Sequence, residues 1–339
     1  FLIHITVSFL IYKITKILLE DKLASFIAAF IYAIHPSHFI TLFWISGSAT
    51  TIGFLLFLTS FYSYLKNREK ISISFFFAAL LASEAMLVGT FMFGAFDYFF
   101  RKKFKIKFYA LIIGISLFIF FIKLLFLKPE NLPDYYGFDF SVKIIDTIRY
   151  YLVRIAGFGE TSSDVFASIL LTVLLILLGF FVLKRIILRI DLKSTLFPFS
   201  LIVAGLLPFV LLPNHLSPHY MNISIFGFAL LVAVVVKSFS LKKRLLYTFL
   251  SFIISTLIVN KTYNNNWVIN RSHIAKEYIV SIDKAQIPNG STVIFNDNEI
   301  SSSQEAYFSL GMGKALDFWF KDKSYKACFT WIENCENVK

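Results

Sequence analysis

The chain has 339 residues, of which 57% are hydrophobic and only 16% are charged, and 42 are phenylalanine. A soluble domain of this length could not cover its surface with so few charged side chains, so the composition excludes an ordinary soluble protein. The formal net charge of +12 arises from basic residues that border apolar segments, and it therefore does not require nucleic acid as a partner.

Apolar segments follow one another through the first 260 residues. A segment that crosses the roughly 30 Å core of a bilayer is expected to be helical, because lipid offers no partner to a bare backbone group. Runs such as 169–183 do not alternate between apolar and polar residues, which excludes the strands of a barrel. The expected spans are 1–19, 23–35, 48–65, 71–83, 86–99, 108–127, 164–183, 195–212, 220–236 and 245–260. The predicted fold class is an α-helical polytopic membrane protein with about ten spans in a domain over residues 1–260.

Lysine and arginine gather in alternate connections between these segments. Short cytoplasmic connections collect basic residues, so we expect these connections in the cytoplasm and the intervening ones at the outer face. The run "RKKFKIK" at 101–107 could alternatively bind anionic lipid or nucleic acid. The predicted location is a bacterial-type plasma membrane, with the tail extracytoplasmic. Residue 1 is a phenylalanine inside an apolar segment, so we expect the sequence to be part of a longer chain.

The tail, 261–339, has a different composition and predicts a small extracytoplasmic α/β domain. A helix over 267–285, the turn "IPNGS", a strand in "TVIF", a helical stretch over 304–320 and a strand over 326–331 are expected. Cys328 and Cys335 lie in this tail. An extracytoplasmic compartment permits a disulfide between them, but the sequence favours free thiols, and neither cysteine has the His or Cys neighbours that a metal site needs.

Two expected outer connections carry polar residues between apolar segments. In "YAIHPSHFITLFWISG", His35 and His38 flank a proline that ends a helix, so they could cap exposed carbonyl groups or contact a substrate. Trp44 could contact a substrate or anchor the chain at the membrane interface. Glu84, in "LLASEAMLV", is either part of a functional site or a connector whose carboxylate reaches water.

Two further outer segments complete the candidate residues. Segment 141–156 has the pattern of an interfacial amphipathic helix, on which Arg149 and Arg154 could hold either the phosphate of a lipid-linked substrate or ordinary lipid headgroups. Its expected faces are Ile144, Ile145, Ile148, Leu152 and Ile155 on the apolar side, and Lys143, Asp146, Arg149 and Arg154 on the polar side. The segment "PNHLSPHYMN" adds His215, His219 and Tyr220 without any acidic residue, so no metal site is predicted.

These residues carry a resemblance to a known group. "HPSHFITLFWISGS" resembles the HP-x-H, acidic residue, W-I-S-G-R segment of GT-C type membrane glycosyltransferases, in particular those related to protein O-mannosyltransferases. "LLASEAMLV" is similar to their Ser-Lys-Glu run, and "SPHYMN" to their Arg-Tyr segment. In order and rough spacing, the resemblance covers about residues 1–260.

The resemblance implies an inverting transferase that moves a sugar from a polyprenyl-phosphate donor to a protein, lipid or glycan acceptor. It implies no resident cofactor and leaves the need for a divalent metal open. Glu84 and His38 would act at the catalytic centre, with the general base in an outer loop upstream of residue 1. The residues that would bind substrate, some by resemblance and some from the segments above, are His35, Trp44, Arg149, Arg154, His219 and Tyr220.

The sequence departs from the pattern at four positions. Ile40, Ser48, Ser83 and His219 stand where these enzymes have an acidic residue, Arg, Lys and Arg. A diverged or inactive member therefore stays open. So does a different class of function, a non-catalytic carrier, flippase or accessory subunit for polyprenyl-linked intermediates of the cell envelope.

Overall fold

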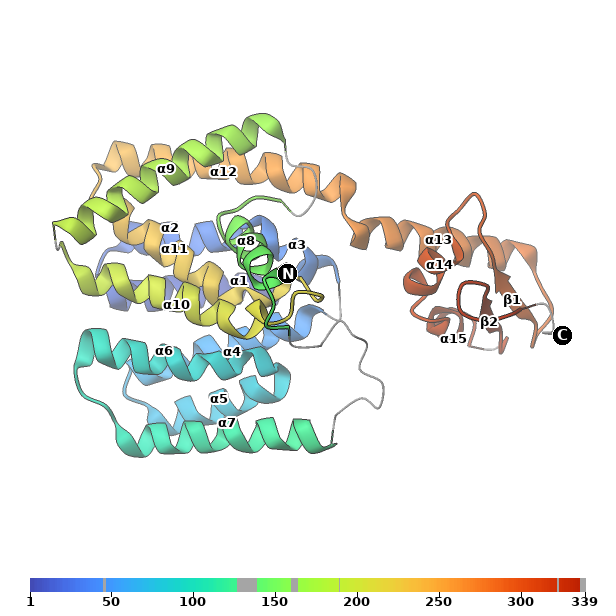
Figure 1. Cartoon of the computed structure of the whole chain (residues 1–339), viewed down its shortest axis with the longest axis horizontal. Coiled ribbons are helices and arrows are strands. Elements are labelled where there is room, and N and C mark those ends of the chain that lie inside the picture. The colour runs from blue at the N-terminus through green and yellow to red at the C-terminus, as the bar shows by residue number, and fades with distance from the viewer. Residues whose placement is uncertain (45–46, 127–138, 160–163, 189, 322, 336–339) are drawn as a thin grey trace. The chain divides into compact units, whose positions relative to one another are not determined.

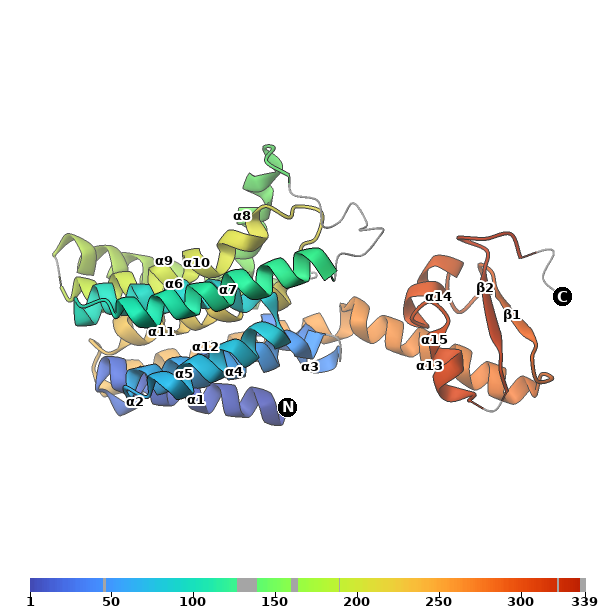
Figure 2. The ribbon, with the colours of Figure 1, turned by 90° about the horizontal axis from the view of Figure 1, so that it is seen from below.

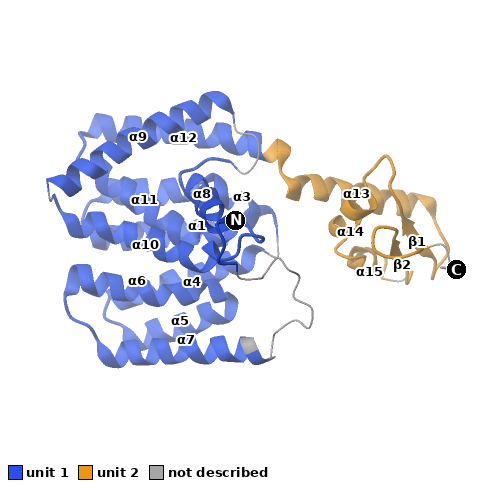
Figure 3. Ribbon diagram, viewed as in Figure 1, with its two compact units in different colours: residues 1–262 blue, residues 263–339 orange. Residues whose placement is uncertain are grey.

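The computed structural model describes residues 1–44, 47–126, 139–159, 164–188, 190–321 and 323–335. The chain divides into two compact units, unit 1 over Phe1–Thr262 and unit 2 over Tyr263–Lys339 (Figure 3). The domain boundary expected at residue 260 lies close to this division.

The described part of unit 1 is built from helices alone (Figure 1). Its α-helices are α1 Leu2–Leu19, α2 Lys22–Ala33, α3 Phe39–Phe43, α4 Ser48–Leu65, α5 Glu69–Ala82, α6 Gly89–Phe96, α7 Ile106–Phe126, α8 Lys143–Ile155, α9 Val165–Ile187, α10 Leu192–Val210, α11 Asn222–Val236 and α12 Leu241–Asn265. Short 3₁₀ or π turns are η1 Pro36–His38, η3 Glu84–Val88, η4 Asp97–Arg101 and η6 Pro218–Tyr220.

Six helices are long and apolar enough to cross a bilayer. They are Leu2–Leu19, Ser48–Leu65, Ile106–Lys123, Val165–Ile187, Leu192–Val210 and a segment within Leu241–Ala285. Helix α2 and the segment Pro36–Phe43 form a pair bent by 47° that would make a seventh span. The chain is thus a helical membrane protein. All ten expected segments contain helix, but α5, α6 and α11 are shorter than a full crossing, so the number of ten spans stays a prediction.

The centre of unit 1 is α11. Every residue of this helix except Phe228 is buried, because α1, α2, α4, α9 and α10 pack around it. The outer helices α7 and α9 are apolar all round instead, and side chains such as Ile176 and Phe180 remain exposed in the structure. A helix that is apolar on every side and only partly covered by protein is suited to contact with lipid.

The connections fall at two opposite ends of unit 1 (Figure 1). We define the basic end by the connections after α1, α4, η4, α9 and α11, where cations satisfy helix carbonyl groups. Lys237 Nζ donates to Leu19 O at 2.6 Å, and Arg101 Nη2 donates to Tyr64 O at 3.2 Å. We define the histidine end by η1, α3, η3, α8 and η6.

A buried carboxylate stabilises the basic end. Asp97 is fully buried and accepts hydrogen bonds from Tyr64 Oη at 2.5 Å and Tyr109 Oη at 3.0 Å. Arg101 Nη1 lies 3.8 Å from Asp97 Oδ1. A buried charge requires such partners, so this network joins the ends of α4, α6 and α7.

Unit 2 is a small α/β fold. It contains α13 Trp267–Ala285, β1 Thr292–Phe295, α14 Ser303–Ser309, α15 Lys314–Trp319 and β2 Lys326–Phe329. The two strands are parallel, with Thr292 opposite Lys326, and α14 and α15 lie between them in the chain. The helical stretch expected over 304–320 is divided, because Gly311, Met312 and Gly313 all have positive φ.

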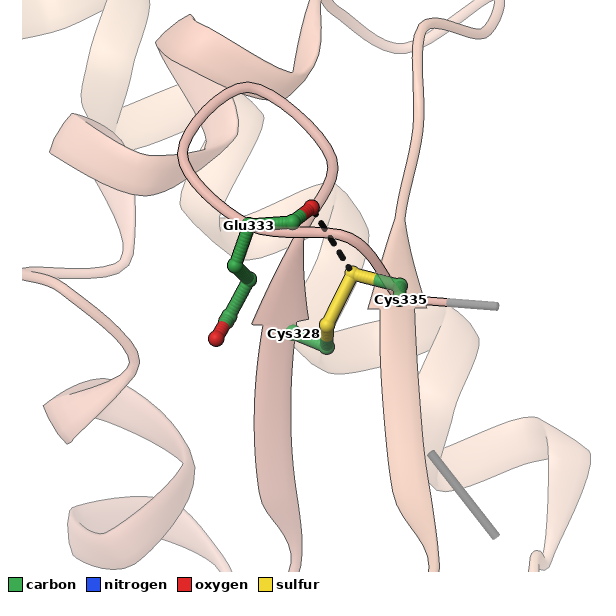
Figure 4. A group of neighbouring side chains, drawn as sticks. All are labelled: Cys328, Glu333 and Cys335. Atoms are coloured by element: carbon green, nitrogen blue, oxygen red, sulfur yellow. Dashed lines mark hydrogen bonds between the residues drawn. A yellow bond between two sulfur atoms is a disulfide. The ribbon is translucent and has the colours of Figure 1, made fainter. Parts of the chain in front are cut away.

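The preference for free thiols in unit 2 is wrong. Cys328 and Cys335 form a disulfide, with Cα atoms 5.9 Å apart (Figure 4). Cys328 lies in β2, and the turn that follows brings the chain back until the two side chains meet. The sequence separation of seven residues does not predict this turn, which follows Phe329, whose ring stacks on that of Phe295.

Candidate functional site

His35 fixes the turn that begins at Pro36. The proline cannot continue α2, and the Ser37 N–H donates to His35 Nδ1 at 3.3 Å. Because Nδ1 accepts this bond, the proton lies on Nε2, which donates to Ile155 O at 3.0 Å. The ring is buried, and its hydrogen bond connects η1 to the last turn of α8.

His38 lies in a buried layer of rings between α1, α2 and η1. Its ring centroid is 4.3 Å from that of Tyr32 and 4.7 Å from that of His4. Tyr32 Oη donates to Asn222 Oδ1 at 3.0 Å, which ties α2 to the start of α11. His38 is likewise buried, and its Nε2 has no hydrogen-bond partner among the described residues. The structure places this predicted catalytic residue within the protein interior.

His219 and Tyr220 organise the second turn, η6. Ser217 Oγ and His219 Nδ1 share a hydrogen bond, and Tyr220 Oη bonds to His215 Nε2 at 2.9 Å. The His219 ring also lies against Trp44, with centroids 5.7 Å apart. Burial, with a further contribution from His215, lowers the pKa of His219 to about 4. At neutral pH the ring is therefore uncharged.

The amphipathic segment forms α8, which crosses the histidine end at a steep angle to the long helices (Figure 2). The sequence predicts an apolar side and a polar side for this helix at the membrane interface. Thr147, Tyr151 and Ile155 are buried against the neighbouring elements, whereas Ile145, Leu152 and other apolar residues are exposed. An apolar row that faces outward on a helix in this orientation fits a helix at a membrane interface.

The two arginines of α8 have different environments. Arg149 is exposed. Arg154 Nη1 instead donates to the carbonyl oxygens of Phe158 and Gly159, and its guanidinium lies 5.0 Å from the Tyr150 ring centroid. Arg154 thus closes the end of its own helix, and the binding of a phosphate by the two arginines stays a prediction.

Glu84 forms an exposed ion pair in η3. Its side chain is 71% exposed, and Oε2 lies 2.9 Å from Lys123 Nζ of α7. Partial burial raises the pKa of Glu84, but the hydrogen bond from Lys123, the backbone N–H of Glu84 and the charge of Lys123 together lower it by more, so the carboxyl pKa lies below its ordinary value. Sequence reasoning missed Lys123, although a lone lysine near the end of an apolar helix is a usable signal.

Two further positions of the motif segments, Ile40 and Ser48, carry uncharged side chains. Ile40 is buried in α3, and Ser48 begins α4. Ile45 and Ser46 of the "WISG" sequence lie outside the described residues. Within the described chain, the one group with metal-ligand spacing is Cys328, Glu333 and Cys335 of unit 2, and its two sulfur atoms are joined in the disulfide (Figure 4).

The histidine end therefore has a buried part and an exposed part. The histidines hold η1, η6 and α8 together, while η3 and α8 both pack on α10. The exposed groups include Trp44, Glu84 and Arg149, and Lys123 beside Glu84 is half-buried. Such groups can bind a phosphate and hydroxyl groups beside lipid. Comparisons with protein-family models, curated proteins and solved structures found no match for this chain.

Proposed function

We propose that this protein is a GT-C type membrane glycosyltransferase that acts at the histidine end of unit 1. The observation that carries the proposal is that η1, η3, α8 and η6, which hold the motif residues, come to one end of a helical membrane unit. This end would face the extracytoplasmic side, since the opposite end holds the basic connections. The reaction type rests on the resemblance of the motifs.

In the proposed reaction, the sugar moves from a polyprenyl phosphate to an acceptor hydroxyl. The bond between the anomeric carbon and the phosphate oxygen breaks, and a bond to the acceptor oxygen forms. Polyprenyl phosphate leaves as an anion, and a carboxylate base takes the acceptor proton. The acceptor is a protein, a lipid or a glycan.

The charges of the exposed side chains suggest which part of the substrate each would contact. Lys123 and Arg149 would contact the donor phosphate, because both are cations that reach the surface of this end. Glu84 would position Lys123 and accept hydroxyl groups of the sugar, since its lowered pKa keeps it ionised at neutral pH. His35, His38, His219 and Tyr220 would maintain the shape of the end on which Trp44 lies.

The test is sugar transfer from a radiolabelled polyprenyl-phosphate donor by membranes that contain the full-length protein. Glu84→Gln and Arg149→Gln should each reduce transfer by about tenfold, the effect of losing one hydrogen bond to a charged group. The matched control is Glu69→Gln. Glu69 also pairs with a lysine, Lys105 at 2.6 Å, but at the other end of α5, and this variant should retain transfer.

The outcomes separate the reaction from the site. If the well-folded wild type transfers no sugar from such donors, the proposed reaction is wrong. If the wild type transfers sugar and Glu84→Gln does so equally well, the assignment of the site is wrong while the reaction stands.

A non-catalytic carrier of polyprenyl-linked intermediates is the second candidate function. The buried position of Ile40, where GT-C enzymes have an acidic residue, favours it. A carrier would move the labelled donor across the membrane of a proteoliposome without forming any glycosylated product.

A further inference from the structure

At the basic end, an open groove lies between η4 with the residues after it and the first turns of α10. Its volume is about 450 Å³. One wall carries Tyr98, Lys102 and Phe104, and the other carries Lys193 and Leu196. The groove is separate from the histidine end, so what it binds does not depend on the proposed function.

The walls of this groove are apolar and accessible. Tyr98 is 65% exposed, Phe104 is 55% exposed and Leu196 is 38% exposed. Phe100 packs against Phe197 with ring centroids 5.4 Å apart, so the two elements that carry the walls, η4 and α10, are in contact. Exposed apolar walls on a membrane-spanning unit are suited to contact with acyl chains.

The two lysines of the groove differ from their cationic neighbours. Arg101, Lys105 and Arg185 each form an ion pair, with Asp97, Glu69 and Asp191 respectively. Lys102 and Lys193 form no ion pair with any described residue. The acids nearest to them in sequence are already engaged, because Asp97 is buried with its two tyrosines and Asp191 pairs with Arg185. The groove therefore has a net positive rim.

We propose that this groove binds one anionic phospholipid. Lys102 and Lys193 lie on opposite walls and would hold the headgroup phosphate between them, while the acyl chains lie along Phe104 and Leu196. Basic pockets between membrane helices select anionic headgroups, because a fixed cation pair gains more from a net negative lipid than from a zwitterionic one. The charge of the rim and the apolar walls together distinguish this occupant from a soluble anion.

The test uses the purified full-length protein in a mild detergent. Phosphatidylglycerol or phosphatidylcholine with the same acyl chains is added, and bound lipid is counted by native mass spectrometry. The wild type should retain phosphatidylglycerol in preference to phosphatidylcholine. Lys102→Gln with Lys193→Gln should lower that retention by about tenfold, as expected for losing charge-assisted contacts.

The matched control is Lys242→Gln with Lys243→Gln. These exposed lysines at the start of α12 also belong to the basic end, and the change in net charge is the same, but they do not line the groove. This control should retain phosphatidylglycerol as the wild type does. Leu196→Trp, which fills the groove and keeps both lysines, should lose it.

Three results would overturn the proposal. They are equal retention of the two lipids by the wild type, unchanged retention by the double groove variant, and displacement of phosphatidylglycerol by inorganic phosphate alone. Size-exclusion elution and thermal unfolding of each variant establish that a loss of lipid does not reflect a loss of fold.

Discussion

Two buried histidines of unit 1, His35 and His219, form hydrogen bonds within the protein. His35 uses both ring nitrogens to hold η1 and α8, and His219 is bonded to Ser217. Rings in these positions favour the neutral form, because a charge at either site would have to be desolvated. These bonds contribute to the structure, and protonation of the rings should therefore affect stability.

The pH dependence of stability should reveal the neutral ring of His219. Because its folded pKa of about 4 is below the ordinary 6.5, its stabilising contribution is complete above pH 6.5 and is lost as pH falls towards 4. Between pH 7 and pH 5, the wild type should lose about 2 kcal/mol more stability than His219→Gln does. Thermal unfolding at the two pH values measures this difference.

The control for this prediction is His273→Gln, a change at an exposed histidine of α13 in unit 2. It should keep the pH dependence of the wild type. Equal losses in the wild type and His219→Gln would show that His219 is not held neutral by the fold.

The sequence identified many of the polar residues at the histidine end but not their partners. "HPSH" and "SPHY" stand out because they interrupt apolar runs, whereas Tyr32 and Asn222 look like ordinary residues of their helices. Asp97 does not stand out in the sequence, and only the approach of Tyr64 and Tyr109 shows that it is buried. Partners distant in the chain depend on tertiary packing, which a single sequence does not contain.

At the scale of elements, apolar runs predicted helices well but did not show which face of a helix packs against protein. A long apolar run forms a helix whether it contacts lipid or protein, because a helix satisfies its own backbone hydrogen bonds. Each of the ten expected segments accordingly contains a helix. The sequence left open which face of α8 packs against protein, because its apolar residues have two environments that can accept them, protein and lipid. A single apolar stripe does not distinguish these environments.

Helix α6 contains two glycines that test its packing. A Cβ atom at Gly89 would overlap the buried ring of Phe57, whereas a Cβ atom at Gly94 would meet no atom within 4 Å. Gly89→Ala should therefore destabilise the protein by about 1–3 kcal/mol. Gly94→Ala should stabilise it by up to about 1 kcal/mol through helix propensity.

Thermal unfolding of the two variants in the same detergent measures the difference. Each variant adds one methyl group to the same helix, so either serves as the control for the other. Equal effects of the two changes would contradict the close contact between α6 and α4.

At the scale of the molecule, unit 1 has two chemically different ends. The basic end uses its cations to satisfy helix carbonyl groups and buried acids, while the histidine end is stabilised by neutral rings. A membrane protein with this asymmetry is expected to be inserted with its basic end in the cytoplasm.

Cysteine labelling in intact cells tests this orientation. Asn214 and Lys66 are exposed and lie at the histidine end and the basic end respectively. A maleimide that does not cross membranes should label Asn214→Cys in intact cells. It should label Lys66→Cys only after permeabilisation. Cys328 and Cys335 remain unlabelled under non-reducing conditions because they form the disulfide, and the reverse pattern at the two introduced cysteines would invert the topology.

The hydrogen bond between Tyr32 and Asn222 also has a consequence for biosynthesis. Its two partners are 190 positions apart in the chain. At about 5–20 residues per second, a ribosome needs roughly 10–40 s to pass from one to the other. During that interval α2 has already been made, but its buried phenol lacks its final partner. The histidine end of a newly made chain therefore closes only once α11 has arrived.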